Sequence, residues 1–187
     1  MKRDVTKKRL ADCFMKLAEK KDVSKITVRE IAEQSNVSSQ TFYNYFQDKY
    51  ELILWIYSDL GSETYKQFIH GEIDLREFIY RCLNFYDEYA RFMVNILNNT
   101  HGTDSFWRNS SDREIRGFER FIIQYYGEEA LTDEIRVHIR MFAYGCTEIA
   151  SAWLQKPNHI SPEILTEYII SFVPDTLRKY LTKEPEK

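Results

Sequence analysis

The sequence predicts an all-α protein in which a small N-terminal three-helix domain with a helix-turn-helix precedes a larger C-terminal helical domain. Three observations predict this class. Apolar residues recur at helical spacing along most of the chain. Only 6 glycines and 4 prolines occur in 187 residues. Residues 26–52, ITVREIAEQSNVSSQTFYNYFQDKYEL, read as two short helices joined by a tight turn, with a third helix directly after them. We place the two domains at residues 1–48 and 49–187.

The first helix is expected over residues 6–20. Leu10, Phe14, Leu17 and Ala18 form an apolar stripe at helical spacing. This stripe supplies the core against which the helix-turn-helix packs.

The second helix begins with a capping box. Thr27 is followed three residues later by Glu30, so that the hydroxyl and the carboxylate satisfy backbone donors at the start of the helix. Ile31 marks its buried face. We expect the helix to end near residues 34–35, because Asn36 is one of the few residues other than glycine that tolerates a left-handed turn.

The third helix has a buried side and a polar side. Ser38 or Ser39 is a suitable N-cap, and Phe42 and Phe46 lie four residues apart and face the core. The other sides carry glutamine, threonine, asparagine and tyrosine. Because Gln and Asn side chains bond adenine and hydroxyls reach phosphates, this polar surface predicts DNA binding. A solvated helical hairpin is the plainer interpretation of the same pattern.

Residues 6–60 resemble the N-terminal domain of the tetracycline-repressor (TetR) family of bacterial transcription regulators. The resemblance rests on ITVREIAEQSNVSSQTFYNYF followed by DKYEL. It implies a DNA-binding domain followed by a helical domain that binds an effector and forms a homodimer. By position, it implies base-facing roles for Ser38, Ser39, Gln40, Thr41 and Asn44. It implies phosphate contacts for Thr27, Tyr43, Tyr45 and Lys49.

The sequence departs from the family pattern at three positions: Asn36 replaces a common Gly, Tyr45 a common His and Tyr50 a common acidic residue. The segment QTFYNYFQDKYELILWIY is also similar to a subgroup of the family linked to dihydroxyacetone-kinase operons, in which some members activate transcription. This subgroup implies an activator that responds to a protein partner. Repression is the commoner behaviour in the family and is the main expectation.

Charge and composition agree with a regulator of this kind. The net charge is -3, but residues 1–49 carry 11 Lys/Arg against 7 Asp/Glu, and the remainder carries 15 against 22. A basic head on an acidic body suits a protein that presents one end to double-stranded DNA. No signal peptide and no membrane-spanning run are evident, so we expect a cytoplasmic protein without a membrane partner.

The rest of the chain reads as helices near residues 49–70, 74–98, 112–126, 132–155 and 162–182. The predicted N-caps are Asp74, Asp112, Thr132 and Ser161. The polar stretch at residues 98–109 is a candidate mobile loop. We expect Pro174 to kink the last helix.

The last two helices carry long apolar stripes that indicate a homodimer interface, built as a four-helix bundle with the same helices of a second chain. The same stripes could fill the core of one chain instead. The predicted interface residues are Ile135, Ile139, Phe142, Cys146, Ile149, Trp153, Tyr168 and Phe172.

Aromatic residues on two central helices indicate an effector pocket for a flat or apolar small molecule. Aromatic residues at helical spacing also serve as plain core. The predicted pocket residues are Phe85, Tyr86, Tyr89, Phe92, Phe118, Phe121 and Tyr125. We expect effector binding to reorient the helix that begins at Lys49 and thereby to change the spacing of the two recognition helices in a dimer.

An enzyme is disfavoured. His70, His101, His138 and His159 lack metal-ligand spacing, and no phosphate-binding glycine loop or nucleophile elbow occurs. Three widely separated cysteines fit neither a zinc site nor a disulfide framework. We therefore expect no catalytic residue, metal or cofactor. A helical interaction module that binds no DNA is the remaining alternative.

Overall fold

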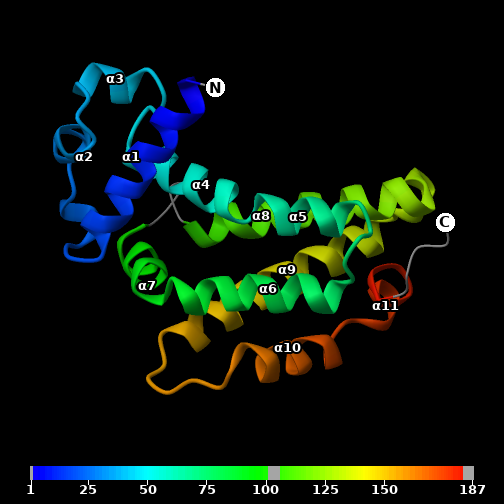
Figure 1. The fold of residues 1–187 in the computed structure, drawn as a ribbon. Coiled ribbons are helices and arrows are strands. Elements are labelled where there is room, and N and C mark those ends of the chain that lie inside the picture. The colour runs from blue at the N-terminus through cyan, green and yellow to red at the C-terminus, as the bar shows by residue number, and fades with distance from the viewer. Residues whose placement is uncertain (1, 101–105, 183–187) are drawn as a thin grey trace. The chain divides into compact units, whose positions relative to one another are not determined.

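The computed structural model describes residues 2–100 and 106–182, and within these ranges the chain forms helices and no strand (Figure 1). The all-α prediction is therefore confirmed. The chain divides into two compact units, Met1–Leu60 with Ala90–Phe106, and Gly61–Tyr89 with Trp107–Lys187. The boundary predicted between residues 48 and 49 falls inside the first unit. No helix in the described part is long and apolar enough to cross a membrane.

The first unit is built around α1 (Lys2–Ala18), which packs against three other helices of the unit. These are α2 (Val28–Gln34), α4 (Lys49–Leu60) and α7 (Ala90–Asn99). The unit also holds the short helices η1 (Val23–Lys25) and α3 (Ser39–Tyr43).

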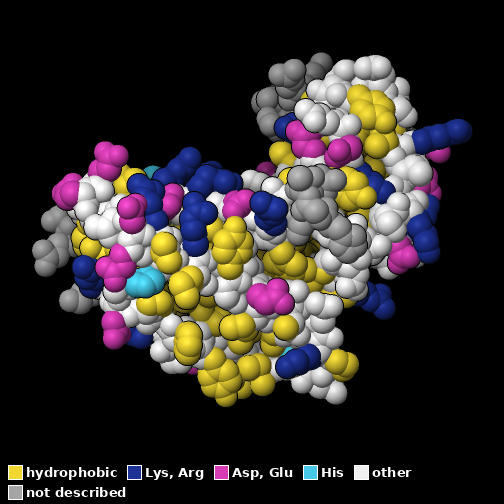
Figure 2. Space-filling view, turned by 180° about the vertical axis from the view of Figure 1, so that it is seen from behind, with side chains coloured by type: hydrophobic (Ala, Val, Ile, Leu, Met, Phe, Trp, Pro, Cys, Tyr) yellow, Lys and Arg dark blue, Asp and Glu magenta, His cyan; other side chains and the backbone are white. Residues whose placement is uncertain are grey.

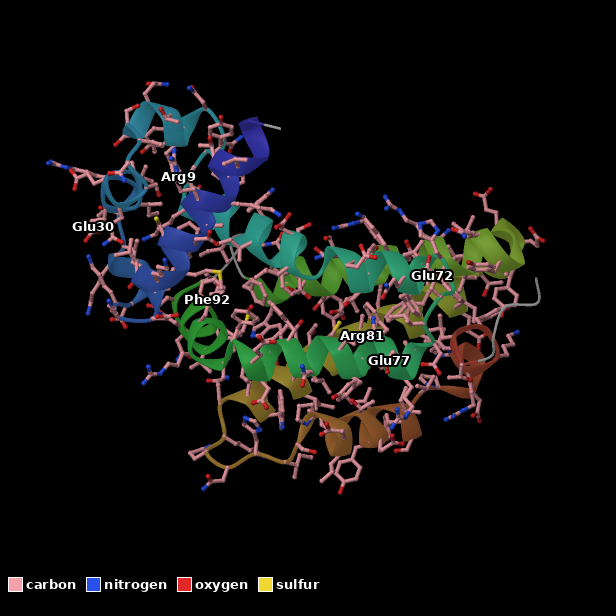
Figure 3. The ribbon with its side chains drawn as sticks, viewed as in Figure 1. Arg9, Glu30, Glu72, Glu77, Arg81 and Phe92 are labelled. Carbon is pink, nitrogen blue, oxygen red and sulfur yellow. The ribbon has the colours of Figure 1, made fainter. Side chains whose placement is uncertain are left out.

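Apolar side chains of all these helices form the core of the first unit. Leu10, Phe14 and Ala18 of the predicted α1 stripe are buried, and Leu17 is half-buried. The Phe14 ring meets Phe92 of α7 edge to face at 6.1 Å, and Figure 3 labels Phe92 on that helix. The predicted helix thus supplies the core of the domain.

The side chain of Asn95 on α7 holds the segment between α1 and η1. Its amide donates to the carbonyls of Ala18 at 2.7 Å and Lys21 at 2.9 Å, and its Oδ1 accepts the Val23 N–H at 3.0 Å. Val23 is fully buried, so that its N–H has no access to water. A single side chain thus satisfies three backbone groups where α1 ends.

The second unit contains α5 (Ser62–Ile69), α6 (Leu75–Glu88), α8 (Phe106–Tyr126, from Trp107 onward), α9 (Asp133–Leu154), α10 (Pro162–Ser171) and α11 (Asp175–Leu181), with the short η3 (Glu128–Ala130). α6 packs against α5, α9 and α10, and α11 packs against α9.

Phenylalanine rings join the helices of the second unit. The Phe68 ring of α5 stacks on Phe78 of α6 at 4.6 Å and on Phe121 of α8 at 5.0 Å. Phe118 of α8 lies 6.1 Å from Phe142 of α9. Close aromatic pairs of this kind contribute beyond their buried area.

Three of the helices predicted in this part of the chain are shorter than expected. The helix expected over 49–70 is divided at Gly61, and the one expected over 74–98 is divided at Tyr89. The last helix stops at Ser171, and α11 begins after Pro174, so that the proline separates two helices where a kink was predicted.

The start of α8 also differs from the expectation. The helix begins at Phe106, so Asp112 lies within it and is not its cap. Of the predicted mobile loop, residues 101–105 lie outside the described residues, and Phe106–Asn109 are helical.

The caps at Asp74 and Thr132 are confirmed, because each side chain accepts a backbone N–H three residues on. Ser161 precedes Pro162 at the first helical position, but its side chain makes no cap bond to the backbone.

We expect Asn95→Ala to destabilise the first unit by about 1–3 kcal/mol, because it leaves the buried Val23 N–H without its acceptor. Urea unfolding followed by circular dichroism measures the change. Asn98→Ala is the matched control, since Asn98 lies exposed on the same helix, and its effect should stay within about 0.5 kcal/mol. Equal stability of the two variants would contradict the role given to Asn95.

Candidate nucleic-acid interface

The start of α2 is fixed by the predicted capping box. The Thr27 hydroxyl accepts the Glu30 N–H at 3.2 Å, and the Glu30 carboxylate accepts the Thr27 N–H at 2.8 Å. Figure 3 labels Glu30 on α2. The Lys21 ammonium also bonds this carboxylate, at 2.6 Å. Lys21 first, and the Thr27 donors next, lower the pKa of Glu30 to about 2. The carboxylate is therefore ionised throughout the physiological range, and the box stays formed.

The turn after α2 follows the prediction closely. The helix ends at Gln34 with Ser35 as its C-cap, and Asn36 has φ 50°, in the left-handed region. The Val37 N–H returns to the Ala32 carbonyl at 3.0 Å. Asn36 thus provides the reversal that lets α3 follow α2 directly.

The short helix α3 is capped at its start and anchored on its inner side. Ser38 Oγ accepts the Thr41 N–H at 3.1 Å. Phe42 and Phe46 are buried, and their rings lie 5.7 Å apart. Because the inner side is anchored by two rings, the remaining sides of the helix are presented outward in a fixed orientation.

The residues predicted to contact DNA differ in accessibility. Thr27, Ser38, Gln40, Tyr43 and Asn44 are exposed, whereas Ser39, Thr41, Tyr45 and Lys49 are half-buried. The Gln40 amide donates weakly to the Asn44 side chain at 3.4 Å, so these two amides form one exposed pair. The five exposed residues present hydrogen-bond donors and acceptors to solvent from α2 and α3, as a nucleic-acid interface requires.

The Lys49 side chain is bound within the protein. Its ammonium donates to the backbone carbonyls of Val23, Ser24 and Ile26, each at 2.8 Å. A lysine has three N–H donors, so all of them are used within the protein. Burial lowers the pKa of Lys49 below its ordinary value. In the single chain Lys49 therefore ties α4 to the segment around η1, and its contact with phosphate stays a prediction.

Other cations of the first unit are placed in two ways. Lys7 lies over the rings of Phe46 and Trp55, at 5.3 Å and 5.6 Å, so part of its charge faces the core. Lys8 and Arg9 are exposed on α1 (Figure 3 labels Arg9). The Trp55 ring of α4 lies 5.9 Å from Phe46 and so packs within the first unit.

The second unit holds a small cavity of about 30 Å³. Its wall is formed by Phe78, Ile79, Cys82, Leu83, Tyr86, Glu114, Phe118, Phe142, Cys146, Thr147, Ala150 and Ile169. Of the predicted effector-contacting residues, only Tyr86 and Phe118 belong to it. Glu114 was not singled out from the sequence, because nothing local distinguishes it from the other charged residues of α8.

The other aromatic residues predicted for the pocket pack elsewhere. Phe121 contacts Tyr125 at 4.8 Å, and Phe85 contacts Tyr89 at 4.9 Å. Phe92 belongs to the first unit. Helical spacing identified these residues as buried or half-buried but did not identify which of them share a cavity.

The predicted dimer residues fall into two groups. Ile135, Ile139, Phe142 and Trp153 are buried within the second unit and belong to its core. Ile149, Tyr168 and Phe172 are exposed, Phe172 to 85%, and Cys146 is half-buried. The buried members of the α9 stripe therefore fill the core of one chain, which is the alternative that the sequence left open. The exposed members stay candidates for a dimer interface.

An exposed apolar face runs over α9 and α10 (Figure 2). It includes Val137, Met141, Tyr144, Ile149, Ile164, Tyr168 and Phe172. An apolar groove of about 410 Å³ lies within it, bordered by Gly145, where an added Cβ would meet no atom within 4 Å. Large exposed apolar patches of this kind are typical of interaction surfaces.

Comparison with known proteins agrees with these features. A family profile described as "Bacterial regulatory proteins, tetR family" matches residues 15–56. YxbF of Bacillus subtilis (strain 168), described as an uncharacterized HTH-type transcriptional regulator, is 24% identical over 179 residues. This match covers 87% of the present chain and 43% of YxbF. The chain spans less than half the length of the curated relatives that it matches.

Two solved structures share the fold over nearly the whole chain. A dihydroxyacetone kinase operon activator, DhaS, has a TM-score of 0.66 and 21% identity, covering 95% of this chain and 99% of DhaS. A TetR transcriptional regulator from Rhodococcus sp. RHA1 has a TM-score of 0.64 and 16% identity, covering 96% and 98%. Residues 15–56, which hold the capped helix-turn-helix, therefore match the tetR family of bacterial regulatory proteins, and the chain shares its fold with solved regulators of that family.

Proposed function

We propose that this protein binds operator DNA through α3 and regulates transcription, acting as a repressor. The supporting observation is the outer surface of α3, where Gln40, Tyr43 and Asn44 are exposed on a helix anchored by two buried phenylalanines. This is the construction by which a helix-turn-helix inserts its second helix into the major groove. Ser38 at its N-terminus and Thr27 at the start of α2 flank that surface with hydroxyl groups.

The side chains on this surface suit a division of roles. The amides of Gln40 and Asn44 have the donor and acceptor pair that matches the major-groove edge of adenine. Tyr43 and Thr27 offer hydroxyls to the phosphates that border the groove. Sequence preference would then come from the two amides, and orientation on the duplex from the hydroxyl groups.

In this proposal the protein acts as a homodimer, and the exposed apolar face on α9 and α10 forms the interface. Met141, Ile149, Tyr168 and Phe172 are apolar or aromatic side chains left in solvent by the single chain. Full burial of each such side chain stabilises an association by about 1.5–3 kcal/mol. A two-fold dimer matches the repeated half-sites that helix-turn-helix proteins bind. We place this dimer in the cytoplasm, where a bacterial operator lies.

The second unit is the proposed site of control, through an effector that changes the spacing of the two recognition helices. The chain passes from α4 to α5 at Gly61, so the helix that carries Lys49 is joined directly to the second unit. Half-sites lie about 34 Å apart or at multiples of that distance, so a small change in spacing lowers the affinity of the dimer.

Activation of transcription is the second candidate, because one structural neighbour is named an operon activator. Such an activator would respond to a protein partner in place of a small molecule. Transcription of the target gene after deletion of this protein separates the two: it rises when a repressor is lost and falls when an activator is lost.

We expect Gln40→Ala and Asn44→Ala each to weaken binding to the specific operator by about 1–3 kcal/mol. Their effect on binding to random DNA should be small, because the amides read bases and carry no charge. Titration of DNA from upstream of the protein's own gene measures both affinities. Gln124→Ala is the control, since Gln124 is exposed on α8 in the second unit. Unchanged operator affinity in both variants, with folding intact, would favour the interaction module.

Lys49→Met should lower stability by about 1–3 kcal/mol and leave the salt dependence of DNA binding unchanged, because three carbonyls already use its donors. The slope of log affinity against log salt measures the second effect. Lys20→Met, which removes an exposed cation, is the stability control. A slope flatter by about two in a dimer would instead mean that Lys49 leaves the carbonyls for phosphate.

Phe172→Glu should weaken the dimer at least about a hundredfold, because each interface would then bury unpaired charge. Light scattering during size-exclusion chromatography measures the mass. Ile123→Glu places the same charge on another exposed apolar residue, on α8, and should leave the dimer intact. A Phe172→Glu protein that remains dimeric would place the interface elsewhere.

A further inference from the structure

Glu114 is the one charged side chain in the wall of the cavity in the second unit. The cavity lies among α6, α8, α9 and α10 and is otherwise lined by apolar and aromatic groups, two thiols and the Thr147 hydroxyl. Four aromatic side chains are among them: Phe78, Tyr86, Phe118 and Phe142. None of the described residues that line this cavity is Lys, Arg or His, so the carboxyl group stands in a mainly aromatic and apolar wall.

The Glu114 carboxyl has no hydrogen-bond or ion-pair partner among the described residues. Burial raises the pKa of this carboxyl to about 8, and the neighbouring charge of Arg113 lowers it only in part. The Arg113 guanidinium itself lies 4.7 Å from the centre of the Tyr65 ring. At neutral pH the acid is therefore mostly protonated, and a cation that entered the cavity would be its first strong partner.

The two thiols of the cavity favour neither a metal nor a nucleophile. Burial raises the pKa values of Cys82 and Cys146 well above their ordinary value, so both thiols stay protonated. Thiolates, not thiols, bind soft metals and attack electrophiles. Among the described residues, no three His, Cys, Asp or Glu side chains are grouped so that they could hold a metal ion.

We propose that this cavity binds a small organic cation of the alkylammonium class, with Glu114 as its counter-ion. Aromatic faces attract such cations, and a carboxylate in the same wall supplies the opposite charge. The inference rests on the proposed function in one respect, namely that the second unit carries an effector site. It adds the chemical class of the effector, which the fold and the relatives do not specify.

The cavity must enlarge to admit an alkylammonium ion, because its volume of about 30 Å³ holds only one or two water molecules. Three of its wall residues, Phe142, Cys146 and Ile169, also border the open groove on α9 and α10. Side chains with open space behind them can shift without displacing packed atoms. Enlargement should therefore occur on this side of the cavity.

The first test compares choline with 3,3-dimethylbutan-1-ol, which has nearly the same shape and no charge. Isothermal titration calorimetry on the full-length protein without DNA measures both affinities. Choline should bind at least about tenfold more tightly than the alcohol. Equal affinities would overturn the proposal, as would failure of choline to bind.

The second test uses pH. The affinity for choline should rise roughly tenfold between pH 7 and pH 9 and then level off, because a carboxylate with a pKa of about 8 must lose its proton to pair with the cation. Of the groups facing Glu114, the thiols of Cys82 on α6 and Cys146 on α9 stay protonated over this range, and burial also raises the pKa of Tyr65 on α5. Arg113 on α8 keeps its charge. An affinity independent of pH would contradict the role of Glu114.

The third test uses variants. Glu114→Gln should lose at least about tenfold in choline affinity and all of its pH dependence, and Glu88→Gln, an exposed change on α6, should lose neither. Wild-type affinity in Glu114→Gln would overturn the proposal, and the first two tests decide it if this variant does not fold. Choline binding that leaves operator affinity unchanged would refute the effector role alone. Operator binding without choline binding would refute the ligand class alone.

Discussion

Three backbone carbonyls between α1 and α2 converge on the ammonium of Lys49, and the position of the segment that leads into α2 depends on this interaction. The segment that they belong to precedes the Thr27 cap, so its position sets where α2 begins. Asn95 holds the same segment from α7 through three further backbone hydrogen bonds. α2 and the short α3 have too few residues to be stable alone. The orientation of α2 and α3 therefore depends on side chains of the longer helices α4 and α7.

The parts of the fold that the sequence predicted well are those encoded by neighbouring residues. The Thr27–Glu30 capping box, the left-handed Asn36 and the Ser38 cap each depend on contacts within a few positions, and the structure contains all three. The roles of Lys49 and Asn95 depend on partners more than 20 positions away in sequence. No local pattern distinguishes a lysine that binds carbonyls from one that binds phosphate.

Dependence on residues far apart in sequence also explains why the helix boundaries and the apolar stripes were predicted only in part. Gly61 and Pro174 are visible breakers, but Tyr89 carries no such signal, and the helices on its two sides belong to different compact units. Periodicity likewise shows that α9 has an apolar side without showing what covers it. Ile139 is buried in its own unit, whereas Met141, two positions on, is 67% exposed. Which side of α9 is covered is decided by the helices that pack against it, α6 and α11.

The two helices that hold the segment before α2 are also the ones through which the chain passes between its compact units. α4 continues into α5 at Gly61, and α6 continues into α7 at Tyr89. Lys49 lies on the first of these helices and Asn95 on the second. A shift of either helix would therefore act on the hydrogen bonds that position the N-terminus of α2. It would not act only on the spacing between the two recognition helices of the proposed dimer. In the proposed regulator, control of DNA binding therefore includes the hydrogen bonds within each chain that position α2, in addition to the geometry of the proposed dimer.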